Sequence, residues 1–240
     1  VWIASGVFIL TLISSSAIVK AKVLLTDPIE LKRSKVSVSG GIRQNNDNQK
    51  PEFIQNFFGT IQLIMAGNDS EGLRYGVIET PEKYFLNWKE QTGIRNKLDS
   101  GLSVLCEKQR FLELIHDFIV FDRGQKKIAR HNQFFAVKES QSKLKKREGG
   151  IIWHTQGSGK TLTMVWLAKW IRENIHDSRV LLITDREELD DQIEQRFYGI
   201  DEAIYRTKSG KDLIKKIDNA EPWLICSLIH KFGRTQSEQE

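Results

Sequence analysis

The feature that most constrains this chain is the stretch GGIIWHTQGSGKTLTM at residues 149–164. An apolar run at residues 151–153 precedes a loop with two glycines, and Lys160 and Thr161 then open a predicted helix. Glycines let consecutive backbone N–H groups converge on phosphate oxygens, and a helix N-terminus adds partial positive charge. The stretch therefore predicts a strand, a phosphate-binding loop and a helix, in preference to an unspecialised glycine-rich turn.

Individual side chains of this loop have expected roles toward a nucleotide. Lys160 is expected to reach the β- and γ-phosphates, and the Thr161 hydroxyl to bind Mg²⁺. The strict pattern G-x-x-x-x-G-K-[ST] has glycine at position 154, where this chain has His154, but the GSGKT core is complete. The further candidates for nucleotide binding are Thr155, Gly157, Ser158 and Gly159.

Beyond residue 150 the sequence alternates between predicted strands and helices. VLLIT at 180–184 is a continuous apolar run, as expected of a strand buried on both faces, and WLICS at 223–227 is another predicted strand. Ligands gather beyond the C-terminal ends of parallel strands, so Thr184 and Arg186 are expected near a bound ligand. Three helices are predicted from apolar stripes or capping residues: Met164, Leu167, Ala168, Ile171 and Ile175; Leu189, Ile193 and Phe197; Ser209 and Asp212. Repeated strand–helix units predict a doubly wound parallel sheet.

The first half of the chain carries weaker signals. KVLLTDPIELK at 22–32 predicts an extended segment interrupted at Pro28, and LRYGVIE at 73–79 predicts a strand. FLELIHDFIVFD at 111–122 is predicted as an apolar helix. Another helix is predicted from Pro51 to Gly67, on the helical spacing of Phe53, Phe57, Ile61 and Ile64 or Met65.

Composition is that of an ordinary globular protein, and the distribution of charge says more than its total. Hydrophobic residues make up 40% of the 240 residues and charged residues 28%, with a net charge of +5. Residues 123–147 hold nine Lys or Arg and one acid, a local net charge of +8. Such a run is typical both of a solvated surface and of a contact with a polyanion, and it marks the predicted domain boundary. Cys106 and Cys226 form no spacing motif and are expected to be reduced, buried and structural, as in a cytosolic protein.

Residues 1–19 carry no charge, which leaves several interpretations, one of them a stretch of out-of-context sequence. They are long enough to span a bilayer, although four serines dilute them. They also resemble a signal-peptide core, but lack a basic region before it and an A-x-A-like site after it. Buried strands of a soluble domain are the favoured interpretation. The chain begins with Val1, so we expect a piece of a longer protein.

The motifs together resemble the motor subunit of type I restriction enzymes, a superfamily 2 helicase-like family. Residues 149–164, VLLITDREELDDQI and LICSLIHKFG look like its helicase motifs I, Ia and Ib, and His154 before the GSGKT core is characteristic of the family. IARHNQFFAV looks like its adenine-reading glutamine motif, which makes Gln133 the candidate adenine contact. A side-chain amide suits both a donor and an acceptor edge. The resemblance implies ATP and Mg²⁺ as cofactors.

Upstream sequence resembles the second half of the family's PD-(D/E)xK nuclease domain. Glu30 and Lys32 match its E-x-K element, and Gln44 matches the glutamine of Q-x-x-x-Y, whose tyrosine is Asn48 here. Residues two apart on a strand share a face, so a carboxylate can bind Mg²⁺ beside an ammonium that stabilises the scissile phosphate. The resemblance implies Glu30, Lys32 and Gln44 as catalytic residues, and Glu30 and Thr161 as metal ligands. Asp27 is an odd number of positions from Glu30 and is expected to face the other way.

The resemblance covers residues 29–234 and leaves parts of the family pattern unmatched. The expected division is an unmatched apolar segment at 1–28, the nuclease-like part at 29–110, a basic linker with the glutamine motif at 111–148, and the first RecA-like ATPase part at 149–240. The fold class is therefore α/β, a partial PD-(D/E)xK nuclease domain followed by part of a RecA-like P-loop domain with a parallel sheet. An earlier nuclease acid, a DEAH-type box and a second motor domain find no match.

The function implied by the resemblance is ATP-dependent DNA translocation coupled to endonucleolytic cleavage. Double-stranded DNA and the modification (methyltransferase) and specificity subunits are the implied partners, in the cytoplasm and without a membrane. This chain alone is expected to be inactive. Two alternatives stay open: a non-catalytic remnant or interaction protein that keeps an ATP-binding loop, and a stand-alone P-loop ATPase with no role on DNA. The basic run and Gln133 argue against the second alternative, which a failure to bind DNA would favour.

Overall fold

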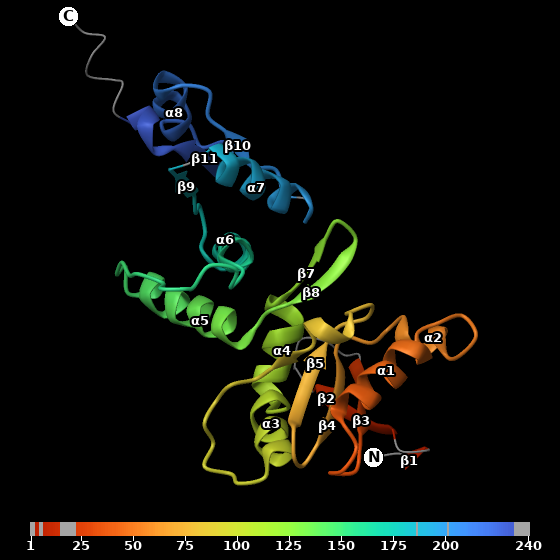
Figure 1. Cartoon of the computed structure of the whole chain (residues 1–240). Helices are drawn as coiled ribbons and strands as arrows, with labels where there is room; N and C mark the ends of the chain where they lie inside the picture. Colours follow the sequence, from red (N-terminus) through yellow and green to blue (C-terminus); the bar gives the residue numbers. More distant parts are fainter. Residues whose placement is uncertain (1–2, 5–6, 15–22, 186, 201, 233–240) are drawn as a thin grey trace, which may run out of the picture. The chain divides into compact units, whose positions relative to one another are not determined.

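The computed structural model describes residues 3–4, 7–14, 23–185, 187–200 and 202–232 (Figure 1). The chain divides into two compact units, described separately below. The N-terminal unit comprises Val1–Val120 and Gln125–Asn132, and the C-terminal unit comprises Phe121–Gly124 and Gln133–Glu240. Within the described ranges, no helix is both long enough and apolar enough to cross a membrane.

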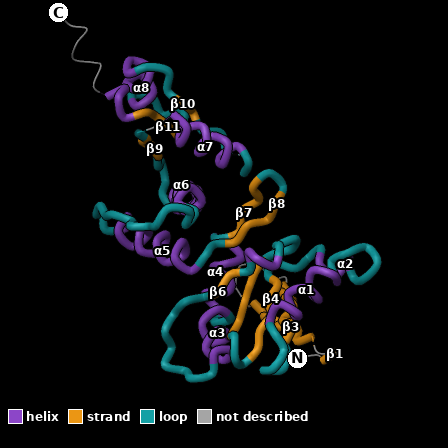
Figure 2. Tube along the Cα trace, in the orientation of Figure 1, coloured by secondary structure: helices purple, strands orange, loops and turns teal. Residues whose placement is uncertain are grey.

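The N-terminal unit is built on one six-stranded sheet whose strands lie in sequence order. Figure 2 draws the strands in orange. They are β1 (Ile3–Ala4), β2 (Val7–Ser14), β3 (Val23–Leu31), β4 (Ile64–Asn68), β5 (Gly72–Gly76) and β6 (Leu86–Asn87). Strands β3 and β4 are parallel, and every other neighbouring pair is antiparallel. A parallel pair needs a crossover connection, which residues 32–63 supply. The described part of the unmatched segment 1–28 thus forms strands.

Strand β3 runs without a break through Pro28, so the predicted interruption is wrong. Pro28 pairs with Ile9 across the antiparallel ladder, and pairing with β4 begins one residue later, at Ile29. Proline removes one N–H, and here it lies just before the ladder with β4 starts. The strand therefore loses little pairing at this residue.

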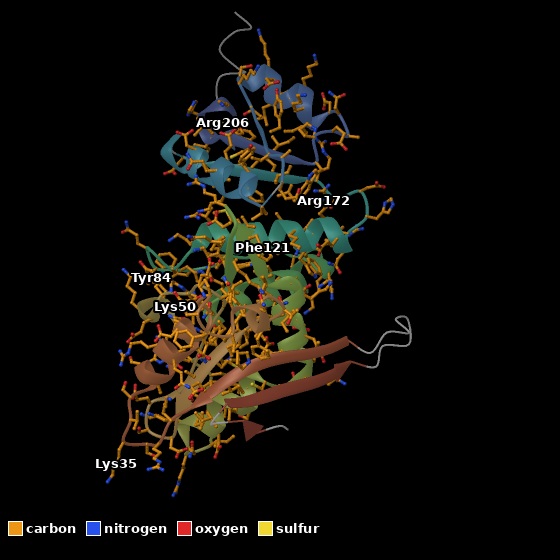
Figure 3. All side chains as sticks on the ribbon, turned by 90° about the vertical axis from the view of Figure 1, so that its right-hand side faces the viewer. Lys35, Lys50, Tyr84, Phe121, Arg172 and Arg206 are labelled. Carbon is orange, nitrogen blue, oxygen red and sulfur yellow. The ribbon has the colours of Figure 1, made fainter. Side chains whose placement is uncertain are left out.

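Two helices, α1 (Val38–Asn48) and α3 (Lys97–Leu105), cover opposite faces of this sheet. Consecutive residues of a strand face opposite sides, and Ala66 and Gly67 are consecutive on β4. A Cβ added to Gly41 of α1 would lie 3.2 Å from the Ala66 Cβ, whereas one added to Gly67 would lie 2.6 Å from Leu98 of α3. Figure 3 draws the side chains of both units, with Lys35 extending away from the N-terminal unit.

The helix predicted from Pro51 to Gly67 is wrong. Only α2 (Gln55–Phe58) is helical there, Phe53 is 60% exposed, and β4 follows with all five residues buried. Strand β4 pairs with β3 on one side and with β5 on the other, which buries its apolar side chains more completely than an isolated helix face would. Helix α1 instead forms over VSGGIRQNNDN, with Ser37 as its N-cap and with Val38, Ile42 and Asn45 turned inward. Tertiary packing therefore overrides the low helix propensity of Gly40 and Gly41.

The basic stretch contains regular elements where a linker was predicted. Helix α4 (Lys108–Asp117) ends before β7 (Ile119–Asp122), which pairs with β8 (Gln125–Ile128). The helix predicted over 111–122 is therefore correct only for its first part. Helix α5 (His131–Lys145) follows, and the 3₁₀ helix η1 (Glu82–Tyr84) lies earlier, before β6.

The C-terminal unit holds a three-stranded, fully parallel sheet in the order β10, β11, β9, which confirms the predicted parallel sheet. Its strands are β9 (Val180–Thr184), β10 (Tyr205–Arg206) and β11 (Leu224–Leu228). Its helices are α5, α6 (Lys160–Asn174), α7 (Glu187–Tyr198) and α8 (Gly210–Ile217), with the 3₁₀ helix η2 (Ile229–Phe232). The predicted cap of α8 is confirmed, because the Ser209 hydroxyl accepts a hydrogen bond from the Asp212 N–H at 3.1 Å.

Three local predictions for the C-terminal unit need correction. Residues 151–153 have no strand conformation, and Ile151 and Trp153 are each 91% exposed, because no described strand pairs with them. Strand β9 is not buried on both faces, since Ile183 is 51% exposed and only Thr184 is buried. In α6 the buried residues are Thr163, Val165, Trp166, Ala168 and Trp170, of which only Ala168 belongs to the predicted stripe.

Both cysteines are reduced thiols, as predicted, but only Cys226 is buried as predicted. Cys226 is buried in β11, and Cys106 is half-buried at the C-terminal cap of α3. Burial raises the pKa of the Cys106 thiol to about 12, and the nearby Asp27 carboxylate adds to the shift. Such a thiol is unreactive at neutral pH, in keeping with the structural role predicted.

Candidate functional site

The GSGKT loop is shaped by two glycines in the left-handed region. Gly157 has φ +74° and Gly159 has φ +85°, a conformation that disfavours side chains with a Cβ. Gly159 is the N-cap of α6, so the loop leads directly into the helix N-terminus. A Cβ at Gly159 would also collide with the side-chain nitrogen of Gln133. Both the turn and the close approach therefore require glycine at position 159.

Lys160 lies across its own loop. Its Nζ donates hydrogen bonds to the carbonyl oxygens of His154 at 3.2 Å and Thr155 at 3.1 Å. The side chain is exposed, so these carbonyls hold the ammonium over the loop without burying it. An ammonium held in this way can exchange weak carbonyl partners for a phosphate with little rearrangement.

Gln133, the candidate adenine contact, is brought to the loop by the first turn of α5. Its side chain is 2% exposed, and its Nε2 donates a 2.9 Å hydrogen bond to the Gly159 carbonyl oxygen. The same carbonyl accepts the Thr163 N–H at 3.2 Å within α6. The structure therefore joins the glutamine motif to the GSGKT loop, although 26 residues separate them in sequence.

Two buried polar atoms of the loop lack protein partners among the described residues. These are the Ser158 Oγ and the His154 Nδ1. An unpaired buried polar group is unfavourable, and such groups concentrate where a ligand or water completes the bonding. With the left-handed glycines and Lys160, these atoms fit a loop that holds a polyphosphate.

The candidate nuclease residues meet in the N-terminal unit. The Lys32 Nζ donates hydrogen bonds to the Glu30 Oε1 at 2.9 Å and to the Gln44 Oε1 at 2.6 Å. Glu30 is 2% exposed on β3, and Gln44 comes from α1, twelve residues after Lys32. Gly41 lets α1 approach, because a Cβ there would lie 3.2 Å from the Glu30 Cγ. Sequence reasoning did not single out Gly41, although the Gly40–Gly41 pair between Ser39 and Ile42 was visible in the sequence.

Asp27 lies on the same strand but belongs to a different environment. Its Oδ1 accepts hydrogen bonds from the backbone N–H groups of Gln62 at 2.7 Å and Leu63 at 3.0 Å. Burial raises its pKa, and these two hydrogen bonds and the positive charge of Lys126 offset only part of that shift. Asp27 therefore holds the chain just before β4, away from the Glu30 cluster, as expected of residues an odd number apart.

Glu30, Lys32 and Gln44 offer only part of what a metal ion needs from its ligands. The described residues contain no group of three or more His, Cys, Asp or Glu that could hold a metal ion. Lys32 occupies one oxygen of Glu30, but the buried Oε2 has no hydrogen-bond partner among the described residues. This oxygen suits a cation, but a single carboxylate oxygen holds one weakly. Arg186, expected beyond the end of β9, lies outside the described residues.

Comparison with known proteins relates the C-terminal unit to a family of ATPases. Residues 132–240 match the model of the SWI2/SNF2 ATPase family. The chain is 32% identical over 154 residues to the "Putative type I restriction enzyme MjaIXP endonuclease subunit" of Methanocaldococcus jannaschii, covering 59% of this chain and 15% of that protein.

Two further relatives are also named as endonuclease subunits of type I restriction enzymes. The type I restriction enzyme HindI endonuclease subunit of Haemophilus influenzae is 29% identical over 189 residues, covering 70% of this chain and 17% of the relative. The SauCOLORF180P endonuclease subunit of Staphylococcus aureus is 24% identical over 214 residues, covering 86% and 23%. The predicted resemblance to the motor and endonuclease subunit of type I restriction enzymes is thus confirmed. The chain spans only 15% to 23% of the length of these three relatives.

Proposed function

We propose that this chain, similar to part of the endonuclease subunit of type I restriction enzymes, supplies the nucleotide-binding loop and part of the nuclease centre of such a subunit. The whole subunit would couple ATP-dependent DNA translocation to endonucleolytic cleavage in the cytoplasm. The observation that carries the proposal is the contact of Gln133 with Gly159, since it joins an upstream glutamine to a GSGKT loop. A glycine-rich turn without a nucleotide role would not need this contact.

In the C-terminal unit, the chain's own residues would bind and orient ATP. The Lys160 ammonium would leave the carbonyls of His154 and Thr155 for the β- and γ-phosphates, and Thr161 would hold Mg²⁺. The residues Thr155, Gly157, Ser158 and Gly159 would line the loop around the phosphates. Mg²⁺, when bound, neutralises charge that builds up on the phosphates during hydrolysis. Gln133 would fix the loop and contact adenine through its amide.

In the N-terminal unit, Glu30, Lys32 and Gln44 would form part of the nuclease centre. Glu30 would offer its unpaired Oε2 to Mg²⁺, while Lys32 would stabilise charge on the scissile phosphate. Gln44 holds the Lys32 ammonium in place by the 2.6 Å hydrogen bond. Since one carboxylate does not orient the metal, we expect no metal-dependent cleavage by these residues alone.

Double-stranded DNA is the proposed macromolecular substrate, and the modification and specificity subunits are the proposed protein partners. The local charge of +8 over residues 123–147 supports the DNA contact. Three relatives named as endonuclease subunits of type I restriction enzymes support the partners.

The proposal is tested by nucleotide binding and by separation of the two activities. Titration of this chain with ATP should show binding that Lys160→Ala reduces about 100-fold, because charge-assisted phosphate contacts are strong. Lys169→Ala, a lysine within α6, is the matched control. In a complete subunit that carries these residues, Glu30→Ala or Lys32→Ala should abolish DNA cleavage and spare ATP hydrolysis. Equal ATP affinity in the wild type and the Lys160 variant would contradict the proposal.

A non-catalytic remnant that keeps the ATP-binding loop is the second candidate. The observation that favours it is the isolated carboxylate at Glu30, with no described group of three metal-binding side chains. ATP binding by this chain, together with a complete subunit that neither translocates nor cuts DNA, would favour this candidate.

A further inference from the structure

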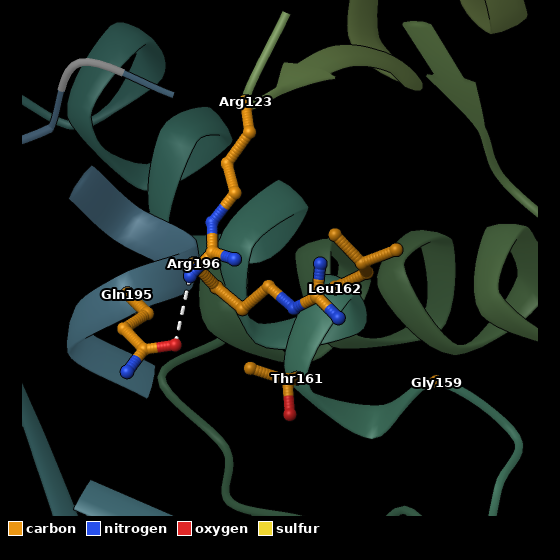
Figure 4. Close-up of a pocket in the computed structure, with 6 residues that line it drawn as sticks. All are labelled: Arg123, Gly159, Thr161, Leu162, Gln195 and Arg196. Carbon is orange, nitrogen blue, oxygen red and sulfur yellow. Dashed lines mark hydrogen bonds between the residues drawn. The ribbon is translucent and has the colours of Figure 1, made fainter. Parts of the chain in front are cut away.

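A cavity lies beside the first turn of α6 (Figure 4). Its volume is about 230 Å³, and it belongs entirely to the C-terminal unit. The residues lining it are Arg123, Gly159, Thr161, Leu162, Gln195 and Arg196. Two guanidinium groups therefore line the same cavity as Thr161, the residue expected to hold Mg²⁺. Neither arginine was singled out by sequence, since each lies outside the recognised motifs.

The two arginines are held in place from both sides of the cavity. Arg123, at the turn after β7, donates its Nη2 to the Gln195 Oε1 at 2.8 Å and its backbone N–H to the Gly199 carbonyl at 3.2 Å. Arg196 of α7 forms an ion pair with Asp122, whose side chain is almost fully buried. Gly199 permits this close approach, because a Cβ there would lie 2.9 Å from the Asp122 Oδ1.

Charge and size together indicate the kind of ligand. Among the described residues that line the cavity, two carry guanidinium groups and none carries a carboxylate, and the N-terminus of α6 adds partial positive charge. The Asp122 carboxylate, paired with Arg196, offsets part of this charge. A volume of about 230 Å³ is below the roughly 300–1,000 Å³ of sites that enclose a whole small molecule. Gln133 is not among the lining residues. The cavity therefore suits the phosphate end of a ligand whose base lies elsewhere.

We propose that Arg123 and Arg196 are further phosphate-binding residues, which contact the terminal phosphate of a nucleoside triphosphate held by the GSGKT loop. The inference deepens the proposed function and rests on it. Arginine suits this role, because its planar donors match phosphate oxygens and it stays charged. The Gln195 and Asp122 contacts position the two side chains before the ligand binds.

The experiment measures the affinity of this chain for ATP, ADP and AMP by titration calorimetry. Arg123→Gln and Arg196→Gln are each expected to weaken ATP binding about tenfold, the loss of one charge-assisted contact. The loss for ADP and AMP should be below about threefold, because those ligands lack the terminal phosphate. Arg196→Lys, which keeps the charge, should recover part of the ATP affinity.

Two controls separate a ligand contact from a structural role. Arg172→Gln removes an arginine of α6 that pairs with Glu202 and does not line the cavity, and should leave ATP affinity unchanged. Asp122→Asn keeps both cations but removes the ion pair that positions Arg196, and should weaken ATP binding by clearly less than Arg196→Gln does. Equal losses for all three nucleotides, or a matching loss in Asp122→Asn, would overturn the inference. If ATP affinity survives in both arginine variants but falls in Lys160→Ala, the inference fails and the proposed function stands. If the wild type binds no ATP, both fail.

Discussion

The two units place their candidate sites by different physical means. In the C-terminal unit the loop is formed chiefly by backbone conformation, with Gly157 and Gly159 in the left-handed region. In the N-terminal unit the cluster is formed by side chains from a strand and a helix, with Lys32 bridging Glu30 and Gln44. A backbone site needs a short contiguous sequence, whereas a side-chain site needs a folded sheet to assemble it.

The two sites also differ in what they leave unsatisfied. The loop leaves the Ser158 hydroxyl and a ring nitrogen of His154 without partners among the described residues. The nuclease-like cluster leaves one carboxylate oxygen of Glu30. The first pattern is suited to an anion with many acceptors, and the second to a single cation. One chain thus carries two candidate sites, and the unpaired atoms of the two suit ligands of opposite charge.

The largest expected effect is that of Gly159→Ala on the C-terminal site. A Cβ at this left-handed residue would be strained and would collide with Gln133, so ATP affinity should fall about 100-fold or more. Gly150→Ala is the matched control, because a Cβ there meets nothing within 4 Å. Binding titrations of the two variants make the comparison. Similar ATP affinity in both would show that the backbone shape does not determine the site.

The next effect tests the N-terminal unit through Asp27. Asp27→Ala removes the acceptor of two backbone hydrogen bonds, and should lower the free energy of unfolding by about 2–3 kcal/mol. Asp27→Asn keeps an acceptor oxygen and avoids a buried charge, so its stability at neutral pH should equal or exceed that of the wild type. Urea denaturation of the three proteins decides between these outcomes.

The pH dependence of the same variants sharpens this test. Because burial raises the folded-state pKa of Asp27, the proton binds more tightly to the folded chain. The stability from this group is thus fully present below the unfolded pKa and is lost as pH rises through the folded pKa. Asp27→Asn should lack this loss, so its advantage over the wild type should shrink as pH falls toward 4. An advantage that does not change with pH would contradict the assignment.

A smaller effect is expected for Gln133→Ala, which tests whether the buried amide reads the base. It should weaken ATP binding about tenfold, and weaken a purine triphosphate lacking the amino group by clearly less. Competition titrations with the two nucleotides provide the measurement. Equal losses for both would assign Gln133 to holding the Gly159 carbonyl alone.

The smallest effect concerns the basic run of residues 123–147. The chain should bind duplex DNA without sequence preference, with affinity that falls steeply as salt rises. Substituting Lys146 and Arg147 by glutamine should reduce the slope of log affinity against log salt by about 2, one for each lost phosphate contact. Lys208→Gln with Lys215→Gln is the control pair. A salt-independent affinity would indicate a contact other than phosphate.

Much of the C-terminal unit was predictable from short contiguous patterns. The apolar runs at 180–184 and 223–227, and the cap at Ser209, each formed as expected, because neighbours in sequence determine them. The predicted strand at 151–153 did not form, since a strand depends on a partner that local sequence does not specify. For the same reason the burial of β9 was overestimated.

The sequence by itself determined the loop, the helix that follows it, and the spacing of Glu30 and Lys32 on one strand. Only the tertiary structure decided that residues 64–68 form a strand, and that α1 carries Gln44 to Lys32. It also decided that Arg123 and Arg196 line one cavity with Thr161. The physical reason is the separation along the sequence of the residues that determine each feature. Backbone conformation and capping depend on a few neighbouring residues, whereas sheet pairing and cavity lining depend on distant residues brought together by burial.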